Sequence, residues 1–166
     1  MPINRRHFLG TAALAGAGIA LTRFGMNTPP AEAAETFPVA YADAEWKRRL
    51  TDGQYRVLRR AATEAPWSSP LNDEHRAGTF QCAGCVLPLF SSRTKFDSGT
   101  GWPSFWRPLP KAVGTRRDRS LMDDRIEVHC ARCGGHLGHV FDDGPPPTGK
   151  RYCMNGVAMK FVPGKS

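Results

Sequence analysis

The chain has 166 residues, the size of one domain, and its hydrophobic fraction of 40% is enough to build a core. Its 17 glycines and 14 prolines favour short strands and many turns over long helices. The formal net charge of +8 would suit a nucleic-acid or membrane binder, but the basic residues are scattered and no nucleic-acid motif accompanies them, so we expect a solvated basic surface and no nucleic-acid partner.

Residues 1–33 are predicted to be an export signal rather than part of the fold. Arg5 and Arg6 precede a small, apolar run over 11–21, a pattern typical of a twin-arginine signal. Arg23 ends the run before it is long enough for a stable membrane anchor, and residues 31–33 (Ala-Glu-Ala) form a small-x-small cleavage site. An ordinary Sec signal or a tethered N-terminus is the alternative. We expect a periplasmic or exported protein carried by the twin-arginine translocase.

The remaining chain is expected to hold a loose linker over 34–42 and one domain over 43–163. A helical pattern of apolar residues runs from 43 to 62. It breaks near Thr51, where Asp52 is placed to cap a second helix. Two helices are therefore predicted at the start of the domain.

Short strands are predicted for most of the domain after these helices. The segments 78–81, 112–120 and 125–129 have strand character, and in the last of these Ile126 and Val128 alternate with Glu127 and His129. Residues 152–162 are expected to form a closing strand pair or one long kinked strand. The predicted fold class is therefore mainly β: a small antiparallel β-sheet domain with N-terminal helices.

The five cysteines divide by spacing into four and one. Two C-x-x-C pairs, Cys82 with Cys85 and Cys130 with Cys133, can close a tetrahedral sulfur cage around one zinc ion. Glycines in or after each pair, Gly84 in the first and Gly134 and Gly135 in the second, favour the turns that such a cage needs. Four cysteines leave no open coordination position, so this zinc would be structural, one ion per chain.

Two disulfides or a redox-active C-x-x-C are the alternatives to zinc. A redox pair usually begins a helix, where the helix dipole lowers the pKa of one thiol, and neither pair here precedes a convincing helix. An oxidising compartment favours disulfides. Twin-arginine export carries folded proteins, however, so a zinc site filled before export would leave the cytosol protected.

Cys153 is the cysteine without a structural partner. A cysteine thiolate is a good nucleophile for sulfur, and a nearby cation lowers the pKa of a thiol. Arg151 is two residues away, which on a strand is the same face. We therefore assign Cys153 as a nucleophile and Arg151 as the stabiliser of its thiolate. The alternatives are an inert buried thiol and an arginine that pairs with an acid.

Three motifs surround the residues discussed above: Gly-Thr-Gly-Trp-Pro-Ser-Phe at 99–105, His-Leu-Gly-His-Val-Phe at 136–141 and Pro-Thr-Gly-Lys-Arg-Tyr-Cys-Met-Asn at 147–155. Together they resemble the B-type methionine sulfoxide reductases. The resemblance extends over about 43–161 and includes the zinc-binding cysteine pairs. It implies an Mss4-like β-tent fold and an enzyme that reduces the R epimer of methionine sulfoxide, repairing proteins after oxidative stress.

The same resemblance implies roles for further residues. His136 and His139, expected close together in a turn, would bind and help to protonate the sulfoxide oxygen together with Asn155. Trp102 would supply an apolar wall for the S-methyl group, and Phe141 would add to the pocket. The alternatives are that the histidines are extra metal ligands and that Trp102 is a core residue. The competing function is a non-enzymatic, zinc-stabilised binding module.

The recycling step is expected to depart from the common pattern of this family. Attack by Cys153 should leave a sulfenic acid on the enzyme. Many members resolve it with a second cysteine in a Gly-Cys-Gly-Trp stretch, where this chain has Thr100. We therefore expect an external thiol as reductant, from a thioredoxin-like protein or a small molecule. We also expect the protein to be a monomer. Gly156, where the family often has serine, is expected to loosen the strand beside Cys153.

Overall fold

The structure, a computed structural model, describes residues 35–118 and 124–164. The export signal expected over 1–33 lies outside these residues. Across the two described ranges, no helix has the length and apolar character needed to cross a membrane.

Two short helices begin the domain, as the periodicity predicts: α1 (Asp43–Arg49) and α2 (Asp52–Arg60). The residue that caps α2 is Thr51. Its hydroxyl accepts a hydrogen bond from the backbone N–H of Gln54, and the Gln54 side chain accepts one from the backbone N–H of Thr51. The prediction that Asp52 is the cap is therefore wrong. Asp52 is the first helical residue, where a negative charge favours the helix dipole.

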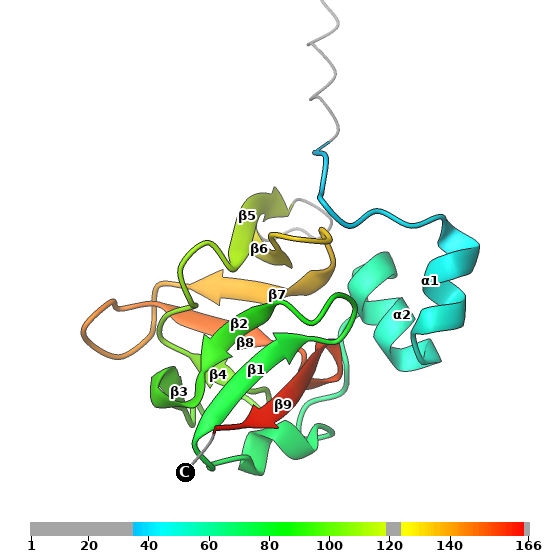
Figure 1. The fold of residues 1–166 in the computed structure, drawn as a ribbon. Helices are drawn as coiled ribbons and strands as arrows, with labels where there is room; N and C mark the ends of the chain where they lie inside the picture. The colour runs from blue at the N-terminus through cyan, green and yellow to red at the C-terminus, as the bar shows by residue number, and fades with distance from the viewer. Residues whose placement is uncertain (1–34, 119–123, 165–166) are drawn as a thin grey trace, which may run out of the picture. The chain divides into compact units, whose positions relative to one another are not determined.

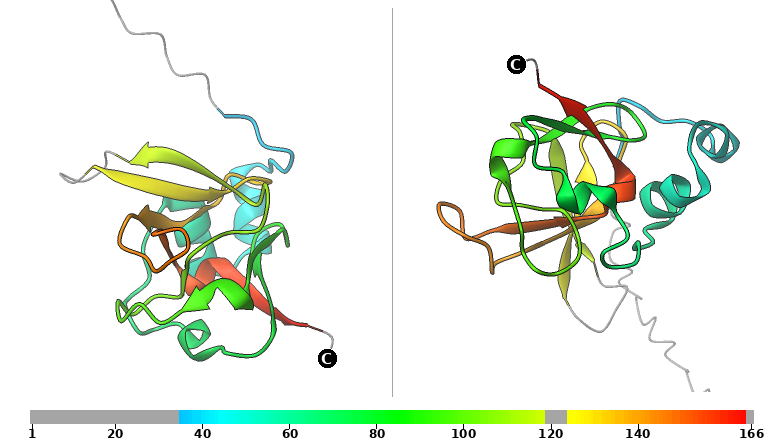
Figure 2. Two further views of the ribbon diagram at one scale, coloured as in Figure 1. Left: turned by 90° about the vertical axis from the view of Figure 1, so that its left-hand side faces the viewer. Right: turned by 90° about the horizontal axis from the view of Figure 1, so that it is seen from below.

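Two antiparallel sheets make up the rest of the described chain (Figures 1 and 2). The smaller sheet has the order β2–β1–β9, with β1 (Gly78–Cys82), β2 (Pro88–Ser91) and β9 (Met159–Pro163). The larger sheet has the order β3–β4–β8–β7–β6–β5, with β3 (Lys95–Phe96), β4 (Ser104–Phe105), β5 (Val113–Asp118), β6 (Arg125–Cys130), β7 (His136–Phe141) and β8 (Arg151–Met154). The 3-10 turn η1 (Pro70–Asp73) precedes β1, and the turns η2 (Ser92–Thr94) and η3 (Gly156–Ala158) lie where the chain passes between the sheets. The predicted mainly β, antiparallel class with N-terminal helices is confirmed.

The chain crosses from one sheet to the other just after Cys153. It leaves β8 in the larger sheet, makes the turn η3 and enters β9 in the smaller sheet. The expected closing pair or single kinked strand is therefore wrong, because β8 and β9 have different partners. The core lies between the sheets, where the ring of Phe90 on β2 stacks on that of Phe105 on β4 with centroids 4.4 Å apart.

Strand β6 buries polar side chains. Glu127 and His129 are 6% and 1% exposed, and Val128 between them is 0% exposed, whereas Ile126 is 38% exposed. The alternation in the sequence therefore predicts the strand correctly, but from Glu127 onward the strand is buried on both faces. A buried carboxylate needs partners, and the partners of Glu127 belong to the functional site.

The segment expected to be a loose linker has contacts with β6 and the turn after it. The backbone N–H of Val39 donates to the carbonyl of Arg132 at 2.9 Å. The ring of Phe37 lies edge-on to His129, with centroids 5.6 Å apart. Glu35 reaches the same imidazole, with its Oε2 3.5 Å from His129 Nε2.

Candidate functional site

The two C-x-x-C pairs come together in one cluster. Their four sulfurs lie within 4.8 Å of one another, with 3.7 Å between Cys82 and Cys133 and 3.4 Å between Cys85 and Cys130. A tetrahedral zinc site with Zn–S bonds of about 2.3 Å places its sulfurs roughly 3.8 Å apart. All five cysteines of the chain are unpaired thiols. The donor set and its spacing therefore fit a structural zinc ion, and neither histidine of the 136–141 motif belongs to the cluster.

The cluster links the two sheets. Cys82 ends β1 in the smaller sheet and Cys130 ends β6 in the larger one, while the second cysteine of each pair comes from the turn after the strand. A metal bound there would connect the ends of β1 and β6, which belong to different sheets and are not hydrogen-bonded strand neighbours.

The turns of the two pairs differ from each other. In the second, Gly134 has a φ of 66°, as its predicted role requires. In the first, the left-handed residue is Val86, with a φ of 55°, and not Gly84. Gly84 packs against Trp46, and a Cβ at that position would lie 3.4 Å from the indole, an ordinary packing distance.

A cavity of about 130 Å³ lies against the thiol of Cys153. Five of the seven predicted site residues outside the cysteine cluster line it. Its full lining is Thr63, Trp102, Arg125, Gly138, His139, Phe141, Cys153 and Asn155. The structure thus brings three sequence motifs to one place, and it leaves His136 and Arg151 outside the lining.

Strand register places polar side chains in a row next to Cys153. Cys153 on β8 lies opposite Ser104 on β4 and, on its other side, opposite His139 on β7. His139 in turn lies opposite Glu127 on β6. Directly opposed residues of antiparallel strands point to the same face of the sheet. The register therefore brings the thiol and an imidazole side by side.

The Cys153 thiol is protonated at rest. Burial raises the pKa of Cys153 above its ordinary value, while Thr100, Arg151 and Ser104 lower it only in part. Arg151 therefore acts in the predicted direction, but its charge is outweighed by burial.

Arg151 pairs with an acid, as its alternative interpretation allowed. Its Nε and Nη2 donate to the two carboxylate oxygens of Asp143 at 2.8 and 2.7 Å, and its guanidinium lies 4.4 Å from the ring centroid of Phe141. The ion pair and the interaction with Cys153 coexist. Asp143 therefore holds the guanidinium next to both the pocket wall and the thiol.

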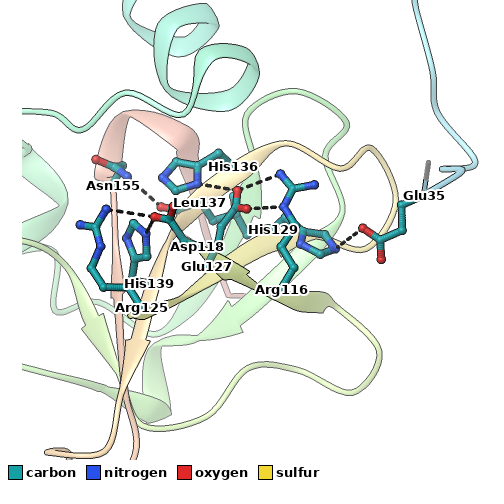
Figure 3. Close-up of polar contacts among 10 residues, drawn as sticks. All are labelled: Glu35, Arg116, Asp118, Arg125, Glu127, His129, His136, Leu137, His139 and Asn155. Atoms are coloured by element: carbon teal, nitrogen blue, oxygen red, sulfur yellow. Dashed lines mark hydrogen bonds and ion pairs between the residues drawn. The ribbon is translucent and has the colours of Figure 1, made fainter. Parts of the chain in front are cut away.

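His139 belongs to a carboxylate-centred group of three (Figure 3). Its Nε2 donates to Asp118 Oδ2 at 2.8 Å, and Arg125 Nη2 donates to the same oxygen at 2.9 Å. Burial lowers the pKa of His139, although the hydrogen bond to Asp118 opposes this. The imidazole is therefore neutral at pH 7 with its proton on Nε2, and Nδ1 is left as an acceptor.

His136 lies behind His139 on the same strand, and not in a turn. It is 4% exposed, and the two imidazole centroids are 5.4 Å apart. Its Nδ1 donates to Glu127 Oε1 at 2.7 Å, and Arg116 donates to the same carboxylate (Figure 3). Burial would raise the pKa of Glu127, but the hydrogen bonds from His136 and Arg116 lower it to about 2. His136 thus supports the site from beneath, and the structure does not bring it to the cavity.

Asn155 and Trp102 are both tied to one residue that the sequence patterns do not indicate, Glu64. The Asn155 side chain accepts a hydrogen bond from the Glu64 backbone N–H at 2.9 Å and donates one to the Leu137 carbonyl at 3.1 Å. The indole N–H of Trp102 donates to the Glu64 carbonyl at 3.1 Å. The amide and the indole that face the cavity are therefore fixed relative to each other.

Gly156 is required by close packing. A Cβ at this position would lie 2.6 Å from the Cβ of Ser69, closer than real Cβ contacts come. The turn directly after Asn155 is therefore tightly packed, and the expected loosening of the strand beside Cys153 stays a prediction.

Sequence reasoning missed the acidic partners of the site. Asp118 and Glu127 lie on predicted strands, but the alternation with Ile126 and Val128 assigns Glu127 to a polar face and gives no signal of its burial. Glu64 carries no such signal, because its partners Trp102 and Val157 lie 38 and 93 residues further along the chain.

Comparison with known proteins agrees with the motifs. The SelR domain family matches residues 50–163. The peptide methionine sulfoxide reductase MsrB of Leifsonia xyli is 54% identical over 129 residues, covering 76% of this chain and 93% of that protein. The MsrB of Agrobacterium fabrum is 52% identical over 123 residues, covering 74% and 91%.

Among solved structures, the Mis18 'Yippee-like' domain aligns with a TM-score of 0.43 and 16% identity, over 55% of this chain and 100% of that domain, a likeness too low to bear on the assignment. The family assignment rests instead on the SelR-domain match and on the sequence identity to MsrB proteins, both of which extend over most of the chain. The chain belongs to the SelR-domain family, the family of the MsrB peptide methionine sulfoxide reductases.

Proposed function

We propose that this protein is a peptide-methionine (R)-S-oxide reductase that returns oxidised methionine residues of proteins to methionine. The observation that carries the proposal is the cavity in which the Cys153 thiol faces Trp102, His139 and Asn155. An apolar wall, a nucleophile and polar groups for an oxygen are the features that a methyl sulfoxide needs. Repair of oxidised proteins is the role that this reaction would serve.

In the first step, Cys153 Sγ bonds to the oxygen-bearing sulfur and takes over its oxygen. The S–O bond of the substrate breaks, a new S–O bond forms on Cys153, and the thiol proton ends on that oxygen. The substrate sulfur is reduced by two electrons and Cys153 is oxidised by two. A thiol and a sulfoxide thus give a sulfenic acid and a thioether without a further reactant.

His139 is suited to carry the proton in this step. The thiol is protonated at rest, and the neutral imidazole has an acceptor nitrogen that is not bound to Asp118. It would take the proton from Sγ as attack begins and deliver it to the departing oxygen. Asp118 would stabilise the imidazolium while the proton is in transit, and Arg125 holds Asp118 in place.

The sulfenic acid would then be reduced by an external thiol. The other four cysteines belong to the metal cluster, and Thr100 lies where a resolving thiol would be needed. A thioredoxin-like protein or a small thiol would displace water from the sulfenic acid to form a mixed disulfide. A second thiol would release reduced Cys153.

The metal, the location and the oligomeric state are parts of the same proposal. Cys82, Cys85, Cys130 and Cys133 would hold one structural zinc ion per chain. The twin-arginine pattern supports export to the periplasm as a folded, zinc-loaded protein, and we propose that this protein is a monomer. Metal analysis and sedimentation of the protein recovered from a periplasmic fraction test all three, and recovery of two disulfides without metal contradicts the zinc assignment.

Turnover of the two methionine sulfoxide epimers with dithiothreitol tests the reaction. The parent should reduce the R epimer of a peptide substrate and leave the S epimer, and Cys153→Ser should reduce neither while keeping the fold. Absence of turnover by the parent would favour a binding module over an enzyme, and turnover of both epimers at the same rate would contradict the assignment to the R epimer.

A further inference from the structure

The carboxylate, backbone N–H and carbonyl of Glu64 all form hydrogen bonds with residues of the catalytic cavity or of the turn η3. Its carboxylate accepts hydrogen bonds from the backbone N–H groups of Gly156 and Val157, the latter at 2.9 Å. Its own backbone N–H donates to Asn155, and its carbonyl accepts from Trp102. No other residue of the described chain links these two pocket residues.

The carboxylate satisfies an otherwise unpaired end of η3. The first N–H groups of a helical turn have no partner within the turn, so they must be satisfied from outside. An ionised carboxylate is a strong acceptor for them. Glu64 is half-buried, and burial raises the pKa of its carboxyl group while the two backbone donors oppose that rise.

The main chain at Glu64 depends on this anchor. Residues 61–65 belong to neither a helix nor a strand, so no hydrogen-bond ladder fixes them. The segment is attached at its two ends, by Ala62 N–H to the Arg56 carbonyl and by Trp67 N–H to the Gly101 carbonyl. Between those points the side chains of Asn155 and Trp102 contact the backbone of Glu64, and the Glu64 carboxylate adds the anchor that ties this backbone to η3.

We propose that Glu64 is a positioning residue of the reductase: its carboxylate fixes its own backbone, and that backbone sets the Asn155 amide and the Trp102 indole at a defined separation. The inference rests on the proposed reductase function. It extends that function to selectivity, because the two groups so fixed would contact the oxygen and the methyl of the sulfoxide. The two epimers differ only in how these substituents are arranged about sulfur.

The test compares Glu64→Gln and Glu64→Ala with the parent and with Glu45→Gln. The control makes the same chemical change at α1, where the Glu45 carboxylate pairs with Arg48 and Arg49. Loss of the anchor should lower kcat/KM for the R epimer by about tenfold, raise KM and reduce the R-to-S ratio by a similar factor, with the alanine variant the more affected. Glu45→Gln should match the parent.

Selectivity separates positioning from mere stabilisation. A variant that is partly unfolded has fewer active molecules, but the ratio of the two epimers and the KM stay the same. Glu64 variants with parental ratio and KM would therefore overturn the inference, even if their kcat is low. A parent that turns over neither epimer would instead overturn the proposed function.

A spectroscopic measurement covers the case in which Glu64→Ala does not fold. In the ¹H–¹⁵N spectrum of Glu64→Gln, the amide signals of Gly156 and Val157 and the indole signal of Trp102 should shift together, and the amides of α1 should not. Shifts confined to Gly156 and Val157, with the Trp102 indole unmoved, would show that the carboxylate does not position the pocket.

Discussion

The hydroxyl of Thr100 lies 3.9 Å from the sulfur of Cys153. It belongs to a short chain of hydroxyl groups, with Ser98 Oγ 2.8 Å from Thr100 Oγ1 and 2.7 Å from Ser104 Oγ. The position at which many relatives carry a resolving cysteine is thus occupied by a threonine, and its hydroxyl group cannot form a disulfide. The Thr100 side chain nevertheless lies next to the sulfur that a resolving thiol would have to reach.

Replacement of Thr100 with cysteine should therefore create an internal recycling step. After a single turnover without reductant, the parent should retain one added oxygen on Cys153. Thr100→Cys should instead lose two hydrogens and carry a disulfide between the new cysteine and Cys153, as intact-mass and peptide analysis would show. Ser98→Cys is the matched control, since its side chain is one hydroxyl further along the chain. A persistent sulfenic acid in Thr100→Cys would contradict this geometry.

The raised pKa of Cys153 predicts that its reactivity increases with pH. The thiolate is the reactive form, so alkylation of Cys153 by iodoacetamide should accelerate through the alkaline range as the thiol ionises. Arg151→Met removes a charge that favours the thiolate and should move the midpoint to higher pH. Arg107→Met, which removes a guanidinium that lies over Trp106, should not. A midpoint that moves to lower pH in Arg151→Met would refute the role given to Arg151.

The buried carboxylate of Glu127 predicts how stability depends on pH. Its pKa is lowered from 4.5 to about 2, so its ionised form stabilises the fold fully above about pH 4.5, and this stabilisation is lost as pH falls towards 2. Glu127→Gln should be less stable at pH 7 by about 1–3 kcal/mol, since His136 and Arg116 lose a charged partner. The two unfolding curves should converge near pH 2. Urea titrations between pH 2 and pH 7 would measure this, with Glu45→Gln as control, and a constant difference would contradict it.

Much of this site could be predicted because its chemistry lies in short motifs. The spacing of Cys82, Cys85, Cys130 and Cys133 predicts a cluster without knowledge of the fold, since each pair needs only a turn. Cys153 is identified by exclusion from that cluster and by the arginine two residues before it. Local signals of this kind also predict α1, α2 and the strand β6, because the spacing of apolar residues that indicates a helix or a strand repeats every two to four residues.

The rest of the site depends on which strands become neighbours, and no local pattern specifies that. His136 and His139 look equivalent in the sequence, yet β7 turns one towards the cavity and buries the other against Glu127. Burial raises the pKa of Cys153, and the hydroxyl groups of Thr100 and Ser104 that oppose this rise come from segments distant in the sequence. The same is true of Gly156, whose packing against Ser69 results from the crossing between the sheets.

Removal of the metal should unfold the domain. The cysteine cluster joins β1 to β6, and a structural zinc contributes an apparent 10–16 kcal/mol, roughly the whole stability of a typical domain. Cys130→Ser, or treatment with a strong chelator, should therefore abolish both bound zinc and the cooperative thermal transition. Cys153→Ser should keep one zinc per chain and the transition. Retention of a parental transition after complete loss of metal would show that the cluster is not structural.

The contact between Gly156 and Ser69 predicts a pair of substitutions that compensate each other. Gly156→Ala forces its new methyl group against the Cβ of Ser69, 2.6 Å away, and overpacking of this kind costs about 1–3 kcal/mol. Ser69→Gly removes the opposing atom, so the double variant should be more stable than Gly156→Ala alone, and urea unfolding of the four proteins gives the coupling energy.

The same cycle should also appear in activity. Gly156 directly follows Asn155, so displacement of the turn moves the Asn155 amide away from the cavity and lowers kcat/KM, and Ser69→Gly should restore it in part. Additive free energies of unfolding would mean that the turn relaxes away from Ser69 without strain. In that case serine at position 156, common in this family, would be tolerated here without any change at Ser69.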